Sequence, residues 1–174
     1  ALLAVVQAAT PAEPPDCAVY EGWFEFAREV RHQHGALTIV PAVSFEVYAR
    51  MFAFDWGRSH QEFASLRQPD GEQIQVPKSV LNQIGSFLVR ENVTCDWDSI
   101  GHGLVRTTEI IEQPHGDRLE DGSIAVSHAA ISEDGSSALI FVSMRGGRLD
   151  EAILLERQTG SRWQVTARQT IHNP

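Results

Sequence analysis

The last third of the chain carries the clearest hydrophobic pattern. Four short runs rich in Ile, Val, Ala, Leu or Phe follow one another, and each gap between them holds glycine with polar neighbours, which is typical of hairpin turns. This pattern predicts an antiparallel β-meander. Its second run is apolar on both faces, so we expect it in the middle of a sheet that is covered from both sides. The expected strands are Ile124–Ser132, Ser137–Met144, Asp150–Arg157 and Arg162–Arg168.

Apolar and polar residues alternate along the last of these runs. Trp163, Val165 and Ala167 occupy alternate positions, and the residues between them are polar. Because successive side chains of a strand point to opposite faces, the alternation predicts that these three share one face.

Two segments upstream have helical periodicity. In the first, apolar residues recur every three or four positions from Asp16 to about Gly35, and Asp16 follows two prolines as a candidate N-cap. In the second, Pro77 marks the start of a helix near residues 78 to 90. Both helices have an apolar stripe, so both are expected to pack on the sheet.

Two further strands are expected outside the meander. A short β-rich run, 36 to 40, stops at Pro41, which suggests an edge strand because proline has no N–H to donate. Another strand is expected at Leu104 to Glu112. Together the elements predict an α+β fold, in which the N-terminal helix and a second helix pack on a curved antiparallel sheet closed by the C-terminal meander. A length of 174 residues suits one domain, which we assign to residues 16–174.

The first 15 residues differ in composition from the rest. Ala1–Ala9 is apolar except for Gln7, Val6-Gln7-Ala8 matches a small-x-small cleavage context, and a proline-rich stretch follows to residue 15. This arrangement is typical of the remainder of an export signal and a linker, which predicts a periplasmic or secreted protein. The alternative is an apolar leader that packs on the domain or on a neighbouring chain.

Charge and hydropathy exclude two classes of partner. The chain has 23 acidic and 14 basic residues, a formal net charge of -9, and no basic cluster. Nucleic acid and anionic membrane surfaces are therefore not expected partners. No apolar run reaches the length of about 20 residues that crosses a bilayer, so the chain is not expected to be transmembrane.

Cys17 and Cys95 are the only cysteines. In an oxidising compartment such a pair can form a disulfide, which makes the two a candidate bridge. Two separate buried thiols are the alternative, and it stays open until the compartment is known. No Cys-Cys or Cys-His spacing indicates a zinc site.

Two groups of polar residues are candidates for chemistry. Asp96 and Asp98 flank a tryptophan close to His102, a set that could serve acid–base catalysis or hold a cation, although a solvated loop is the preferred explanation in so acidic a chain. His32 and His34 form an HxH pair, a weak candidate for a metal site, but they lie at the end of a predicted helix, where the helix dipole favours histidine. We expect no metal and no cofactor.

Three patches of the sequence together cover about half of the chain: Ser127–Val142 with Ile153–Arg157 and Gly160–Val165, the early Ala18–Tyr20, and Phe87–Asn92. They resemble an uncharacterised family of exported bacterial proteins. The closing hairpins are also similar, more loosely, to nuclear-transport-factor-like and cystatin-like domains, which implies helices packed in a curved antiparallel sheet but no particular function.

Three functions are compatible with these features. The preferred hypothesis is an exported, non-catalytic domain that binds a protein or a small ligand in a pocket lined by Trp23, Tyr48, Phe52 and Trp56. The second is a hydrolase or lyase that uses His and Asp of the 96–117 region. The third is a structural or assembly component that docks through its apolar N-terminus.

Overall fold

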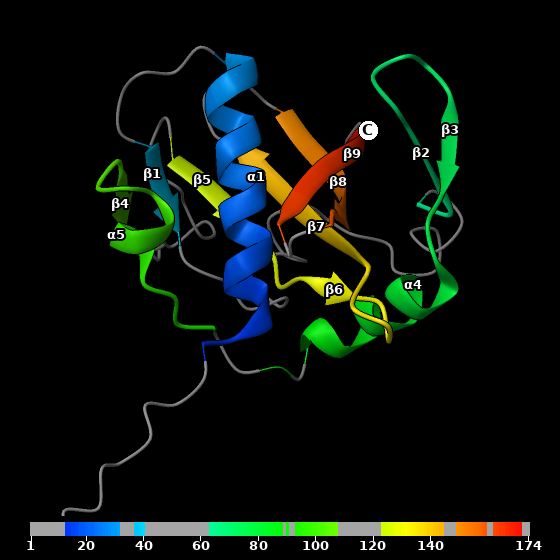
Figure 1. The fold of residues 1–174 in the computed structure, drawn as a ribbon, viewed down its shortest axis with the longest axis horizontal. Coiled ribbons are helices and arrows are strands. Elements are labelled where there is room, and N and C mark those ends of the chain that lie inside the picture. The colour runs from blue at the N-terminus through cyan, green and yellow to red at the C-terminus, as the bar shows by residue number, and fades with distance from the viewer. Residues whose placement is uncertain are drawn as a thin grey trace, which may run out of the picture.

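The fold is a curved β-sheet with helices on both faces (Figure 1). The computed structural model describes residues 13–31, 37–40, 63–88, 90, 93–107, 123–144, 149–159 and 162–171. The predicted export remnant and most of the linker therefore lie outside the described residues, and their assignment stays a prediction.

One nine-stranded sheet connects all the strands of the described segments, in the order β3-β2-β9-β8-β7-β5-β1-β4, with the short β6 paired to β7. Most pairs are antiparallel, whereas β1 runs parallel to both of its neighbours. The predicted α+β class is confirmed, with a sheet that is mixed at one end. The strands are β1 (Leu37–Val40), β2 (Ser65–Arg67), β3 (Gln73–Gln75), β4 (Val105–Thr107), β5 (Ser123–Val126), β6 (Ala130–Ile131), β7 (Ser137–Met144), β8 (Leu149–Arg157) and β9 (Trp163–Ile171).

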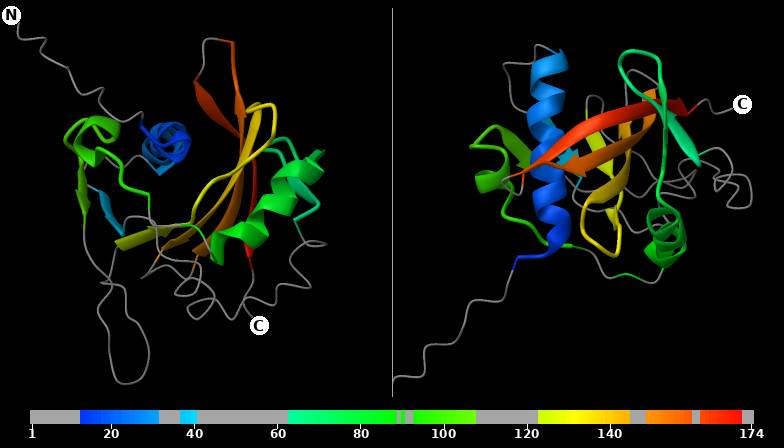
Figure 2. Two further views of the ribbon diagram at one scale, coloured as in Figure 1. Left: turned by 90° about the horizontal axis from the view of Figure 1, so that it is seen from below. Right: turned by 45° about the vertical axis from the view of Figure 1, so that its right-hand side comes forward.

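The two long helical segments cover opposite faces of the sheet. Helix α1 (Pro15–Arg31) lies on the concave side, where it packs against β8 and β9, and α4 (Lys78–Ile84) packs on the other side against β6 and β7 (Figure 2). Helix α4 continues as the 3-10 helix η1 (Gly85–Leu88), so the predicted second helix is confirmed over these residues. A one-turn helix, α5 (Trp97–Ile100), lies beside α1.

Strand β7 is buried on both faces, as its apolar run predicts. Ile140 faces the core on the α1 side, together with Trp23 and Phe24, and Phe141 faces the core on the α4 side, together with Phe63. Each of these side chains is at most 1% exposed. Two apolar cores, one on each face, therefore hold the helices to the sheet by removing apolar surface from water.

Strand β1 is not an edge strand, contrary to the prediction. It lies between β4 and β5, and Ile39 is completely buried. Pro41 follows the strand, so the missing N–H of this proline removes no hydrogen bond from β1 itself. The four residues of β1 can therefore pair on both sides.

Strand β9 changes face near its middle, so the predicted shared face of Trp163, Val165 and Ala167 is wrong for the last residue. Leu154 pairs with Ala167 and Leu155 pairs with Val165, which leaves one additional residue on β9. Such a bulge shifts the alternation by one position. Ala167 consequently packs on the α4 side and Trp163 on the α1 side.

Close packing at Gly22 sets the rotation of α1 against β9. A Cβ atom at this position would lie 2.7 Å from the Cβ of Trp163 and would also meet the Trp163 carbonyl group. Because a carbonyl cannot move aside without disturbing the strand, Gly22→Ala is expected to lower the free energy of unfolding by about 2 kcal/mol. Equilibrium urea unfolding measures this loss. Glu29→Ala, at an exposed position of the same helix, is the control. Equal stability of the two variants would contradict the close packing of Gly22 against Trp163.

The turn between β6 and β7 is held by one carboxylate. Asp134 accepts hydrogen bonds from the Ser132 hydroxyl (2.6 Å), the Ser136 hydroxyl (2.7 Å) and the Ser136 N–H (3.0 Å). These bonds lower the pKa of Asp134 from 3.8 to about 2, the bond from Ser132 contributing most.

This pKa shift predicts a particular acid dependence of stability. A carboxylate whose pKa is lower in the folded state stabilises the fold above its unfolded pKa, and the contribution is lost as the pH falls through the folded pKa. We expect the free energy of unfolding to fall between pH values near 4 and near 2, and to fall less in Asp134→Asn. Urea unfolding across this pH range tests the expectation. It fails if the free energy of unfolding falls equally in wild type and in Asp134→Asn.

Candidate functional site

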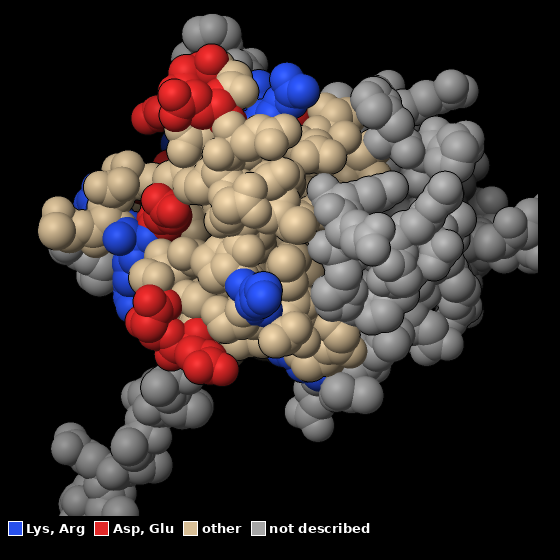
Figure 3. All heavy atoms as spheres, turned by 90° about the vertical axis from the view of Figure 1, so that its right-hand side faces the viewer, with Lys and Arg blue, Asp and Glu red and all other residues tan. Residues whose placement is uncertain are grey.

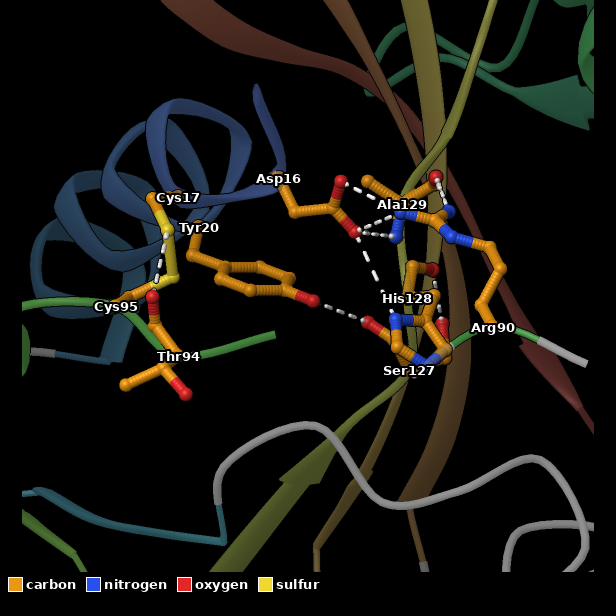
Figure 4. The surroundings of a disulfide bond; sticks show 9 residues. All are labelled: Asp16, Cys17, Tyr20, Arg90, Thr94, Cys95, Ser127, His128 and Ala129. Carbon is orange, nitrogen blue, oxygen red and sulfur yellow. Dashed lines mark hydrogen bonds and ion pairs between the residues drawn. A yellow bond between two sulfur atoms is a disulfide. The ribbon is translucent and has the colours of Figure 1, made fainter. Parts of the chain in front are cut away.

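A disulfide joins α1 to the segment that leads into α5. Cys17 and Cys95 are bonded to each other, with their Cα atoms 5.6 Å apart, and both are buried (Figure 4). One turn further along α1, the Tyr20 ring stacks on Trp97 of α5 with ring centroids 5.5 Å apart. Of the two alternatives that the sequence left open, the structure has the bridge, and the bond together with the aromatic stack holds α5 against α1.

Next to the disulfide lies a buried polar group that we call the Asp16 cluster: Asp16, Tyr20, Arg90, Ser127 and His128 (Figure 4). Asp16 and His128 are each 1% exposed. The cluster brings together three parts of the chain: the start of α1, the segment just after η1 that contains Arg90, and the connection between β5 and β6.

Asp16 is the central acceptor of this cluster. Its two carboxylate oxygens each lie 2.8 Å from Nη2 of Arg90, and Oδ1 also accepts the Ala129 N–H at 3.1 Å. Asp16 was predicted to be the N-cap of α1, but the helix begins at Pro15 and the carboxylate binds partners in other elements instead. A buried carboxylate needs such partners, because an unpaired charge in the interior is costly.

The pKa of Asp16 is lowered despite its burial. Burial alone raises this pKa, but the imidazole of His128, whose Nδ1 lies 3.8 Å from Oδ1, the hydrogen bond from the Ala129 N–H and the positive charge of Arg90 together outweigh it. Asp16 is therefore ionised at neutral pH.

For Tyr20, burial raises the pKa and the charge of Asp16 raises it further, so the phenol stays protonated and acts as a donor.

The side chain of Ser127 accepts the hydrogen bond from the neighbouring strand that its backbone carbonyl would accept in a regular sheet. Its carbonyl accepts the Tyr20 hydroxyl at 3.0 Å, and its Oγ accepts the Phe141 N–H at 2.9 Å. This exchange interrupts the sheet, so the strand predicted at 124–132 is two strands, β5 and β6, with residues 127–129 between them. The tyrosine of α1 therefore binds backbone that a regular strand would use for its own ladder.

His128 lies among these groups without a hydrogen bond. Its Nδ1 is 3.8 Å from Oδ1 of Asp16, beyond hydrogen-bond distance, and neither ring nitrogen has a hydrogen-bond partner. The Ser127 hydroxyl donates to the His128 carbonyl at 2.8 Å rather than to the imidazole. Ser127 and His128 consequently do not form a nucleophile and base pair.

A second group of polar side chains is exposed. Glu21 and Glu25 lie one turn apart on α1, and His102 lies in the turn between α5 and β4. One ligand atom of each, a carboxylate oxygen or an imidazole nitrogen, lies within 4.8 Å of the other two. We call these three residues the surface triad, and they are the only group of this kind among the described residues.

The acids and the histidine that the sequence grouped have different surroundings in the structure. Asp96 is the N-cap of α5, where its carboxylate accepts the Ser99 N–H at 3.2 Å, and Asp98 is exposed in the first turn of the same helix. His102 instead meets the two glutamates of α1. Sequence reasoning missed Glu21 and Glu25, although their spacing of four places both on one helical face.

The remaining candidate residues are only partly described. Trp23 is 1% exposed and lies in the apolar core on the α1 side. The other proposed lining residues, Tyr48, Phe52 and Trp56, and the histidine pair His32 and His34 lie outside the described residues. A pocket built from this set stays a prediction.

No helix among the described residues combines the length and the apolar character that crossing a bilayer requires. Comparisons of the chain with protein-family models, with curated proteins and with solved structures find no match.

Proposed function

We propose that this chain is an exported, non-catalytic domain that binds a protein or a small ligand. The observation that carries the proposal is the disulfide between Cys17 and Cys95. Disulfides form and persist in oxidising compartments such as the bacterial periplasm or the extracellular space, and they are rare where thiols are kept reduced. The resemblance of the closing meander to exported bacterial proteins supports the same compartment.

The use of the buried polar residues supports binding rather than catalysis. Asp16, His128 and Ser127 are the residue types that many hydrolases use, but here each is at most 2% exposed. Asp16 holds Arg90 and a backbone N–H, and the Ser127 hydroxyl bonds to backbone. Groups that are occupied in this way maintain the position of α1 on the sheet and do not face a substrate.

The charge of the accessible surface indicates the class of ligand. The chain carries a net charge of -9, and its exposed acids include Glu21, Glu25 and Glu29 at successive turns of α1. On the face seen in Figure 3, acidic and basic side chains lie in small separate groups among uncharged residues. We therefore propose that the ligand is positively charged and binds beside α1.

Intact mass spectrometry of the protein from its native host tests the proposed compartment. The periplasmic and extracellular fractions are alkylated before and after reduction. We expect the protein in one of these fractions, with two alkyl groups added only after reduction. Recovery in the cytosol with two thiols that react without reduction would overturn the proposal.

A further inference from the structure

We propose that the surface triad, Glu21, Glu25 and His102, binds Zn²⁺, with solvent or a group of a partner at the remaining coordination position. The inference rests on the proposed function, because it names the ligand of the binding domain. The three residues come from α1 and from the turn that follows α5, which lie side by side.

The donor set suits zinc better than a hard cation. It offers one imidazole nitrogen and two carboxylates, and three protein ligands with one open position are the usual arrangement of an accessible zinc site. Mg²⁺ and Ca²⁺ prefer oxygen ligands only. The single nitrogen ligand is what distinguishes the triad from an ordinary group of surface acids.

The spacing of the three ligand atoms is close to what a zinc ion requires. Zinc bonds to nitrogen and oxygen are about 2 Å long, so tetrahedral ligand atoms lie about 3.3 Å from one another. In the structure the triad atoms lie within 4.8 Å of one another. Because the glutamate side chains are exposed, small changes in rotamer can bring their carboxylate oxygens to the spacing that zinc requires, without a backbone shift.

The surrounding structure fixes the two elements that supply the ligands. Cys17, Glu21 and Glu25 recur at intervals of four along α1, so the disulfide and the glutamates share one face of the helix. The disulfide attaches that face to the segment before α5. In the turn beyond α5, the N–H groups of His102 and Gly103 bond to the carbonyls of Ser99 and Asp98, which holds the backbone of His102 at a defined place.

The charges of the triad also favour a cation. Two glutamates one turn apart on a helix repel each other. No Lys or Arg of the described segments forms an ion pair with either glutamate, whereas Asp16 pairs with Arg90 and Glu151 with Arg168. A bound cation would remove the repulsion between the two carboxylates.

Isothermal titration of the complete, oxidised protein with ZnCl₂ tests the site at a pH near 7.5, after removal of metals by a chelator. His102→Asn removes the nitrogen ligand, and asparagine tolerates the positive φ of 49° at this position. Glu25→Gln removes one carboxylate. Glu29→Gln is the matched control, since it removes the same charge one turn away, outside the triad.

We expect His102→Asn and Glu25→Gln each to weaken Zn²⁺ binding by at least about tenfold, the loss usual for even the outer partners of metal ligands. Glu29→Gln should change the affinity by less than about twofold, and MgCl₂ should not compete. In nuclear magnetic resonance spectra, the ring protons of His102 should shift as Zn²⁺ is added. Thermal unfolding of each variant without metal verifies that it is folded.

Two results would overturn the zinc site. In the first, wild type and all variants bind Zn²⁺ equally or not at all, which would mean that the three side chains do not act together as ligands. In the second, Glu29→Gln loses as much affinity as Glu25→Gln, which would indicate diffuse attraction by the acidic face. Either result leaves the proposed export intact, because the compartment is tested by mass spectrometry, independently of the titration.

Discussion

Replacing both Cys17 and Cys95 by alanine is expected to lower the free energy of unfolding by about 4 kcal/mol. The two residues are 78 positions apart, so the bond closes a long loop and restricts the unfolded chain strongly. Alanine is preferred to serine here because both sites are buried and a hydroxyl would lack a partner. The loss is a large part of the 5–15 kcal/mol, approximately, that stabilises an ordinary domain.

Urea unfolding of the oxidised wild type, the reduced wild type and the double variant measures this contribution. The reduced protein and the variant should agree with each other. Hydrogen exchange should show faster exchange of the amides of α5 in the variant, since α5 would then be held to α1 by the stack of Trp97 on Tyr20 and by apolar packing, without the covalent bond. Stability within about 1 kcal/mol of the oxidised wild type would contradict an important role for the bond.

Asp16→Ala is expected to lower the free energy of unfolding by about 3 kcal/mol. The substitution leaves the Arg90 guanidinium without its carboxylate and the buried Ala129 N–H without its acceptor. The value is at the low end for a buried ion pair because the Arg90 side chain is 29% exposed and can regain some hydration. Asp16→Asn should lose less, because its amide oxygen can still accept one of these bonds.

The pH dependence distinguishes this role of Asp16 from simple packing. The pKa of Asp16 is lowered in the folded protein, so its contribution is present above the unfolded pKa of about 3.9 and is lost as the pH falls through the folded value. The stability difference between wild type and Asp16→Ala should therefore be largest at neutral pH and shrink in acid. Glu29→Ala, an exposed change on the same helix, should differ from wild type by less than about 0.5 kcal/mol. A pH-independent loss in Asp16→Ala would indicate packing alone.

Long apolar runs with clear periodicity were the most predictable part of the fold. The apolar run of β7 predicted a strand buried on both faces, and the structure places one core on each side of it. The helical period after Pro77 likewise predicted α4 and η1. In both cases the local pattern and the burial in the fold agree, so residues close in sequence carried enough information.

Sequence reasoning failed where a single residue changed the geometry of a strand. The bulge in β9 moved Ala167 to the other face, and Ser127 divided a predicted strand by using its hydroxyl as a backbone acceptor. Neither event leaves a signal in the hydrophobic pattern, because each depends on hydrogen bonds to another strand or helix. The same holds for Asp16, which reads as an N-cap and instead binds Arg90, 74 positions away.

The sequence by itself determined the α+β class, the meander, the two amphipathic helices and the availability of one cysteine pair. These properties follow from periodicity and composition, which act over a few residues. Only the tertiary structure decided that Cys17 meets Cys95, that β1 lies inside the sheet, and that His102 lies beside Glu21 and Glu25. Contacts of this kind join segments far apart in the chain. They are set by how the two cores pack, which no local pattern records.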